Sequence, residues 1–220
     1  MKPAFHAAVD DEERATLVAL LRVQPNGMTW SDIAERVAEA GSARAVWSDL
    51  YPETLVGDPS PQDELAAARA AIRKWRDEPP RFLTFLDEDY PERLRDVRQM
   101  PPVLFAAGEL VASEIAISVV GSRQADESAL AFARETALLL TGRGMTVLSG
   151  LAAGVDTAAH KAALQAGGRT VAVIGTGIRR QYPAENANSS ARYRKRDWCS
   201  PGSGRTARPP AGPFRCATRP

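Results

Sequence analysis

The sequence predicts an α/β protein: a main domain built on a doubly wound, mostly parallel β-sheet, with a small helical domain before it. Three apolar runs of strand length, residues 115–120, 145–148 and 170–174, are each followed by Gly or Ser and then by a segment compatible with a helix. This alternation is typical of parallel strands joined by crossover helices. The 220 residues are enough for one medium-sized domain and a smaller one.

Short helices joined by tight turns predict the helical domain, which we place at residues 1–60. Residues 10–22 have acids in the first turn and then an apolar face, and residues 24–27 contain the Pro and Gly of a turn. Two more helices are expected, one from residues 29–32 onward and one at residues 42–50. This domain could have either of two roles: it could contact DNA or a partner protein, or it could serve only as a packing adaptor. The lack of a basic stripe along its helices favours the adaptor.

The connecting segment, residues 61–81, combines an Ala-rich helix with a linker. Pro79 and Pro80 stop that helix, because proline removes a backbone donor and clashes with the preceding turn. The main domain follows over residues 82–187. It begins with a strand at residues 82–86, a short helix at residues 91–97 and a second strand at residues 103–106. We expect these elements to extend the main sheet.

The three apolar runs end in turns of small residues. In a parallel sheet such turns meet at the carboxyl edge of the strands, where ligands bind and where the following helices point free N–H groups. A helix over residues 126–141 follows the first turn, and Asp156 is expected to be the N-cap of the helix after the second turn. The three turns are Gly121-Ser122-Arg123, the segment from Ser149 to Gly154, and Gly175-Thr176-Gly177.

Residues 188–220 break this pattern. They contain seven Arg, five Pro and no apolar run, so we expect a disordered basic tail that supplies neither a strand nor a buried helix. Eight Lys or Arg stand against one acid there, whereas the whole chain has a net charge of +1. The rest of the chain is therefore mildly acidic, and any nucleic-acid binding must come from a local basic surface. A frameshifted or truncated end is the favoured explanation of the tail, and a genuine basic tail is the alternative.

Composition also predicts the compartment. The sequence has no run of about 18 apolar residues, so no membrane span is predicted, and its first residues lack the apolar core of a signal peptide. We therefore expect a cytoplasmic protein. Cys199 and Cys216 stand apart from any His cluster and indicate neither a disulfide scaffold nor a zinc site, so no metal site is predicted.

Three motifs occur in the order and spacing of a known family. VVGSR, SGLAAGVDTAAHKAAL and VAVIGTGIRRQYPAEN, preceded by DYPERL and PPVLFAAG, resemble the Rossmann-like core of the bacterial DNA-processing protein A family, also called DprA or Smf. The long second motif makes the resemblance specific, and the match covers residues 82–186.

This resemblance implies binding of single-stranded DNA without sequence preference. It also implies protection of incoming DNA during natural transformation and loading of the RecA recombinase onto that DNA. A sterile-alpha-motif-like or helix-hairpin-helix-like unit is expected at the N-terminus. The family resemblance implies a homodimer, although the altered C-terminal end argues against a dimer of this chain.

By the same resemblance, Arg123 is the first candidate for a contact with a DNA phosphate. Its planar guanidinium can bind two phosphate oxygens at once, and the alternative is an ion pair with Asp126 or Asp156. The glycines let backbone amides approach an anion closely and form an anion-binding nest. The candidate DNA-binding residues are Gly121, Ser122, Arg123, Ser149, Gly150, Gly154, Gly175, Gly177, Arg179 and Arg180.

Other motif residues are assigned structural roles. Asp156 is interpreted as a cap rather than a catalytic acid, and His160, four residues later on the same helix, as a hydrogen-bond partner that orders the fold. Tyr182 and Pro183 are interpreted as residues that shape the backbone, and stacking of Tyr182 on a DNA base is the alternative. The structural or capping residues are Asp156, His160, Tyr182, Pro183 and Asn186.

The predicted mechanism is capture of DNA without catalysis, and it needs no cofactor. The turn after the second strand is not GxGxxG, so the sequence gives little support to a nicotinamide cofactor. The main alternative is a Rossmann-like nucleotide enzyme of the nucleoside-monophosphate phosphoribohydrolase type, but the PGGxGTxxE loop expected in such enzymes is missing. An inactive remnant is a third hypothesis, because a sheet without its last part would leave residues 170–174 as an open edge strand.

Overall fold

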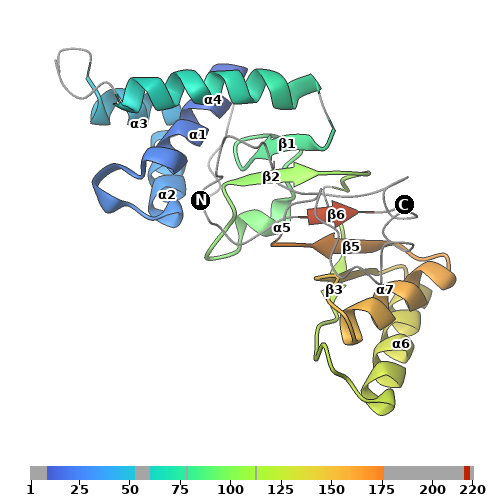
Figure 1. The fold of residues 1–220 in the computed structure, drawn as a ribbon. Helices are drawn as coiled ribbons and strands as arrows, with labels where there is room; N and C mark the ends of the chain where they lie inside the picture. Colours follow the sequence, from blue (N-terminus) through green and yellow to red (C-terminus); the bar gives the residue numbers. More distant parts are fainter. Residues whose placement is uncertain (1–8, 53–59, 78, 112, 176–215, 219–220) are drawn as a thin grey trace. The chain divides into compact units, whose positions relative to one another are not determined.

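The computed structural model describes residues 9–52, 60–77, 79–111, 113–175 and 216–218 (Figure 1). It divides into two compact units, the first made mainly of Met1–Val103 and the second beginning at Leu104. This division differs from the boundaries at residues 60 and 81 that the sequence suggested. None of the helices in the described part of the chain is long and apolar enough to cross a membrane.

The first unit contains a layer of packed helices. Helix α1 (Asp11–Val23) packs along α4 (Ser60–Asp77) and against α3 (Ala43–Leu50), and α2 (Trp30–Ala40) contacts α3 (Figure 1). Helix α4 is therefore part of this layer, whereas the sequence had suggested a connecting helix. The buried side chains that hold the layer together are mostly aliphatic and include Leu17, Leu20, Ile33, Val37, Leu65 and Ile72.

Two buried carboxylates lock this unit through hydrogen bonds. Glu13 of α1 accepts from the backbone N–H of Ala43 and, at 2.9 Å, from Nε of Arg44, so it ties α1 to the start of α3. Asp87 accepts from the backbone N–H of Thr84 at 2.7 Å and from Nη2 of Arg14 at 2.5 Å. Each carboxylate is thus paired and hydrogen-bonded, which offsets the cost of its burial.

Strands β1 (Arg81–Thr84) and β2 (Val103–Ala106) form a two-stranded sheet of their own. The prediction that they extend the main sheet was wrong. Local hydrogen bonds explain the pairing, because the N–H of Phe85 donates to the Pro102 carbonyl at 3.0 Å and the buried Tyr90 hydroxyl donates to the Pro101 carbonyl at 2.6 Å. These bonds bring the turn after β1 to the residues just before β2, and the short helix α5 (Glu92–Arg95) lies between them in sequence.

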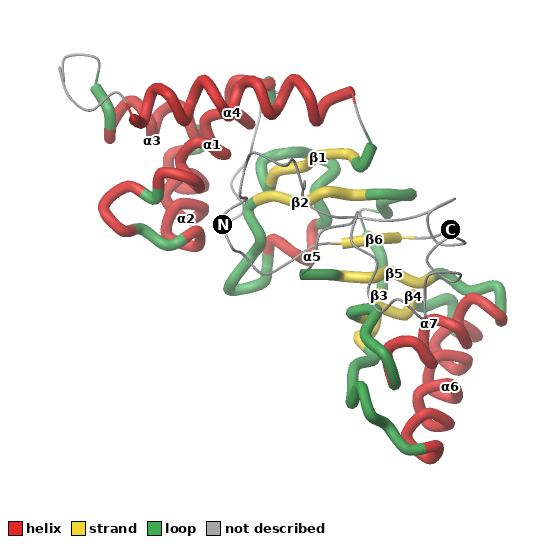
Figure 2. Tube along the Cα trace, viewed as in Figure 1, coloured by secondary structure: helices red, strands yellow, loops and turns green. Residues whose placement is uncertain are grey.

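The second unit contains the predicted α/β core (Figure 2). Strand β3 (Ala116–Ser118) pairs in parallel with β4 (Thr146–Ser149), and β4 pairs in parallel with β5 (Thr170–Val173). Helices α6 (Glu127–Gly142) and α7 (Val155–Gln165) form the two crossovers between these strands. The α/β class and the mostly parallel sheet are confirmed.

The sheet also corrects two expectations about the end of the chain. Strand β6 (Cys216–Thr218) pairs antiparallel with β5, so the prediction that residues 188–220 supply no strand was wrong. Because β5 has β4 on one side and β6 on the other, residues 170–174 are not the open edge. Within the described sheet, β3 and β6 are the two end strands, and Ile117 of β3 is 43% exposed.

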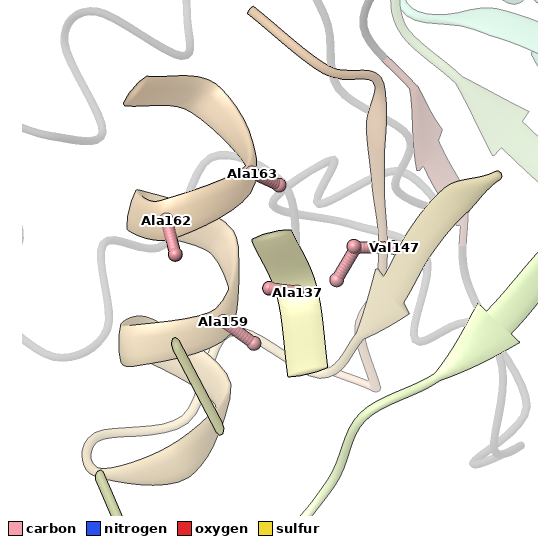
Figure 3. Packing of buried hydrophobic residues seen from close by; sticks show 5 residues of the cluster. All are labelled: Ala137, Val147, Ala159, Ala162 and Ala163. Carbon is pink, nitrogen blue, oxygen red and sulfur yellow. The ribbon is translucent and has the colours of Figure 1, made fainter. Parts of the chain in front are cut away.

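Small side chains form the core between α6, α7 and the sheet (Figure 3). Their short Cβ groups let the helices approach each other and β4 closely, which keeps the interior densely packed. The opposite side of α6 has large apolar side chains on its surface, with Phe132 72% exposed and Leu139 55% exposed. The cluster consists of Ala137, Val147, Ala159, Ala162 and Ala163.

Candidate nucleic-acid interface

Parallel pairing brings the first two predicted turns and Gly175, the first residue of the third, to one edge of the second unit. Ile117 pairs with Val147, and Ser149 pairs with Ala172, so β3, β4 and β5 run in the same direction and in register. The turns that follow these strands therefore share the carboxyl edge of the sheet. Their first glycines, Gly121, Gly150 and Gly175, are all exposed there.

The first of these turns packs against the start of α7. The backbone N–H of Val155 donates to the Ser122 carbonyl at 3.2 Å. Gly154 lies so close to this turn that a Cβ atom would be 2.2 Å from the Ser122 oxygen, and a Cβ at Gly121 would be 2.8 Å from Cγ2 of Val155. Both glycines are thus required by close packing, which fixes the path of residues 121–123.

Arg123 is exposed on this fixed turn. The Ser122 hydroxyl accepts a hydrogen bond from the N–H of Gln124 at 3.1 Å and so shapes the backbone on either side of Arg123. The two acids that the sequence offered as ion-pair partners of Arg123 both accept backbone hydrogen bonds, and the choice between a phosphate contact and an ion pair for Arg123 stays a prediction. Asp126 accepts from the N–H of Ala129 at 2.8 Å as the N-cap of α6, and Asp156 accepts from amides of its own loop.

Asp156 does not occupy the position that the sequence suggested. The N-cap of α7 is Gly154, with φ +80°, and Asp156 is the second residue of the helix. Its Oδ2 accepts from the N–H of Gly150 at 3.1 Å and from the N–H of Ala152 at 3.2 Å. The amides predicted to form an anion-binding nest therefore converge on a carboxylate of the protein itself.

Leu151 stands between these two amides with φ +62°, a left-handed conformation that is uncommon for a residue other than glycine. The Thr157 hydroxyl donates to the Ala152 carbonyl at 2.7 Å and holds the far side of the loop. Neither residue was predicted to shape the site, and neither leaves a signal in the sequence. A leucine gives no indication of a positive φ, and a threonine in the first turn of a helix has many common roles.

Ser149 is buried, with 2% of its surface exposed. Its hydroxyl donates to the Val119 carbonyl at 2.6 Å and joins the ends of β3 and β4. The side chain is thus used inside the sheet, and a contact of the Ser149 backbone with DNA stays a prediction. Its role is to align the two strand ends that present the turns.

His160 lies inside the unit rather than at the edge of the sheet. Its Nδ1 is 2.6 Å from Oγ1 of Thr170, and that hydroxyl donates to the Val147 carbonyl at 2.7 Å. Since the hydroxyl proton is used by the carbonyl, Nδ1 carries the proton of a neutral imidazole and donates it to Thr170. Burial lowers the pKa of His160 from 6.5 to about 4, although the charge of Asp156 acts in the opposite direction.

Six predicted residues lie outside the described part of the chain, so their placement stays a prediction: Gly177, Arg179, Arg180, Tyr182, Pro183 and Asn186. Among the described residues, no group of three or more His, Cys, Asp or Glu side chains gathers in a way that could hold a metal ion. The described part of the candidate interface consists of the exposed Arg123 turn, the loop closed by Asp156, and Gly175.

The sequence and the fold are similar to those of known proteins. The sequence profile of the DNA recombination-mediator protein A family matches residues 81–199. Protein Smf of Synechocystis is 39% identical over 112 residues, which are 49% of this chain and 28% of that protein. DNA processing protein DprA of Streptococcus pneumoniae is 41% identical over 106 residues, which are 47% of this chain and 36% of that protein. The chain thus matches about a third of the length of these relatives.

A solved structure extends the similarity to the fold. The crystal structure of DprA from Streptococcus pneumoniae superposes with a TM-score of 0.62 and 27% sequence identity. The superposition covers 84% of this chain and 65% of that chain. It includes more of this chain than the sequence match does and supports a Rossmann-like α/β fold.

Proposed function

Because the chain belongs to the DNA recombination-mediator protein A family, we propose that it binds single-stranded DNA without sequence preference at the carboxyl edge of β3, β4 and β5. One observation carries this proposal: Arg123 is exposed on a turn whose backbone is held by Gly154 and Val155 of the next loop. Because the backbone of this turn is already fixed, binding of a phosphate by the guanidinium costs only the conformational entropy of the arginine side chain.

The chemistry of this edge suits a polymer of phosphates. Every nucleotide of a single strand carries the same phosphate, so a contact from Arg123 reads no sequence. Gly121 and Gly175 are exposed at this edge, so no side chain of their own covers their backbone there. Arg179 and Arg180 are proposed to add positive charge beside this path, as the sequence predicts.

We propose capture of DNA rather than catalysis, with no cofactor. The buried acid of the edge, Asp156, is hydrogen-bonded to two backbone amides, and the buried His160 donates to Thr170. Both groups are directed into the fold, away from a strand bound at the surface. These contacts support binding as the function of the edge.

The family description, recombination mediator, supports a wider role. In this role the bound strand passes to the RecA recombinase during natural transformation, inside the cytoplasm. A homodimer is part of this role for the whole family protein, whereas the altered C-terminal end argues against a dimer of this chain. All of these steps involve the whole family protein, of which this chain matches about a third.

The test is fluorescence anisotropy of a labelled oligo-dT with the full chain, measured across a salt series. Arg123→Ala should weaken binding about tenfold or more, because a charge-assisted contact contributes about 1.5 to 3 kcal/mol. The slope of log affinity against log salt should fall by about 0.7, the value for one phosphate contact with a single strand.

The matched control is Arg143→Ala. Arg143 is also exposed, but it caps the C-terminal end of α6, just before β4 begins, and so belongs to the opposite edge of the sheet. Its loss should leave both the affinity and the salt slope nearly unchanged. Equal effects of the two substitutions would argue against DNA binding at the carboxyl edge. Tight binding by Arg123→Ala would indicate that DNA contacts the basic residues 188–220 instead.

A further inference from the structure

The loop between β4 and α7 contains the arrangement by which proteins hold phosphate, but a carboxylate occupies it. Amides at the start of a helix and in a turn rich in small residues form a cradle for anions. Here the amides of Gly150 and Ala152 point at the same oxygen, Oδ2 of Asp156, at 3.1 and 3.2 Å. Asp156 is 5% exposed, so the carboxylate fills the cradle from within.

The surrounding residues fit this occupant closely. A Cβ at position 150 would be 3.0 Å from Oδ2 of Asp156, which is tight, so glycine gives the carboxylate its space. Asp156 lies in the first turn of α7, where the helix dipole stabilises a negative charge. The positive φ of Leu151 turns both neighbouring amides toward the same point.

We propose that Asp156 is a specificity-determining residue that closes this loop to the phosphate of free nucleotides. A phosphate could enter the cradle only by displacing a buried carboxylate that holds the same two donors, and the two negative charges repel each other. The interface is then left with exposed contacts such as Arg123, which suit one phosphate after another along a strand. This last step rests on the proposed binding of single-stranded DNA, whereas the exclusion of phosphate does not.

The carboxylate of Asp156 separates two chemistries that this fold can support. A Rossmann-like enzyme that acts on mononucleotides needs its strand-end amides free for the ligand. A protein that binds a polymer at its surface does not need these amides for the ligand. Its loop is already ordered by its own carboxylate, so binding does not lose further conformational entropy in that loop. Asp156 thus favours the second chemistry over the first.

The test uses inorganic phosphate and AMP as probes of the 220-residue chain and of its Asp156→Ala variant. The natural chain should bind neither probe detectably, and NMR signals of the Gly150 and Ala152 amides should not move. Asp156→Ala frees two donors and removes the repelling charge, so its affinity for phosphate should rise by about tenfold or more. Phosphate should also raise the melting temperature of this variant and not that of the natural chain.

Two further variants keep the result interpretable. Asp126→Asn removes an equal charge from the same edge but frees no loop amide, so it should gain no phosphate binding. Asp156→Asn keeps the volume and an acceptor oxygen, so it should fold and show a smaller gain than Asp156→Ala. Movement of the Gly150 and Ala152 signals by phosphate in the natural chain would overturn the proposal, as would folded Asp156 variants that gain no affinity.

The oligo-dT measurement distinguishes the two proposals. If the natural chain binds no DNA but Asp156→Ala gains phosphate binding, the proposed function fails and the exclusion by Asp156 stands. If DNA binds at Arg123 but the Asp156 variants remain without affinity for phosphate, the reverse holds.

Discussion

The carbonyl oxygen of Ser122 lies 2.2 Å from the point where a Cβ at Gly154 would stand. Two turns that follow different strands are therefore in backbone contact, and the contact tolerates no side chain. Gly154 also has φ +80°. The position thus combines a steric requirement with a conformational one.

Replacing Gly154 by Ala should lower the free energy of unfolding by about 3 kcal/mol or more, because the strained backbone contributes about 1 to 3 kcal/mol and the clash adds to it. Gly167→Ala is the control, since Gly167 has φ +72° but a Cβ there would have no other atom within 4 Å. It should lose about 1 to 2 kcal/mol from the backbone alone. Urea unfolding measures both, and equal losses would disprove the steric contact.

Gly121 and Val155 should be energetically coupled. Gly121→Ala places a Cβ 2.8 Å from Cγ2 of Val155, and overpacking of this kind costs about 1 to 3 kcal/mol. Val155→Ala removes the obstructing methyl groups, so the double variant should be more stable than the sum of the single losses by about 1 kcal/mol. Additive losses in a double-mutant cycle would show that the first turn is free to move.

The stability of the protein should fall as the pH drops below 6.5. The pKa of His160 is about 4 in the folded protein, so between pH 6.5 and 4 the unfolded chain binds a proton that the folded chain does not. The contribution of the neutral His160 to the free energy of unfolding is fully present above pH 6.5. About 2 kcal/mol of it should be lost between pH 7.5 and pH 5. Other groups titrate in this range, so the relevant measurement is the difference between the natural chain and His160→Gln. That difference should shrink by the same amount at pH 5.

Asp87 should contribute far more stability than Asp89, although each carboxylate pairs with an arginine. Asp87 is buried and bonded to Arg14 and Thr84, whereas the side chain of Asp89, bonded to Arg81, is 58% exposed. Asp87→Ala should cost about 2 to 3 kcal/mol because it leaves buried donors unpaired. Asp89→Ala should cost less than about 1 kcal/mol. Thermal unfolding at low and high salt compares them, and similar losses would contradict the role given to burial.

The sequence predicted the second unit well because its signals are local. Apolar runs such as residues 145–148 have strand length, and an alternating pattern of this kind has few foldable arrangements other than a parallel sheet. The placement of β1 and β2 was missed for the opposite reason. Their apolar pattern predicts that they are strands but does not predict which strand each one pairs with. The pairing depends on hydrogen bonds such as the one from the Tyr90 hydroxyl to the Pro101 carbonyl.

The site was predictable at the level of its loops and not at the level of its contacts. Glycines after three strands indicated a shared edge, and the parallel registers agree with it. The sequence offered Asp156 as an N-cap, because Asp before an apolar helix is a common capping signal. A carboxylate that turns back four to six residues to meet Ala152 and Gly150 depends on the left-handed Leu151, which composition and spacing do not reveal.

The end position of β3 in the sheet has a consequence for the behaviour of the protein in solution. Residues 116–118 contain neither a charge nor a proline, the features that keep many terminal strands from pairing with other chains. Ile117 within this strand and Val120 just after it are exposed. The free edge of such a strand can pair with a strand of another molecule, so the protein can self-associate in solution. Self-association through β3 should therefore increase with protein concentration.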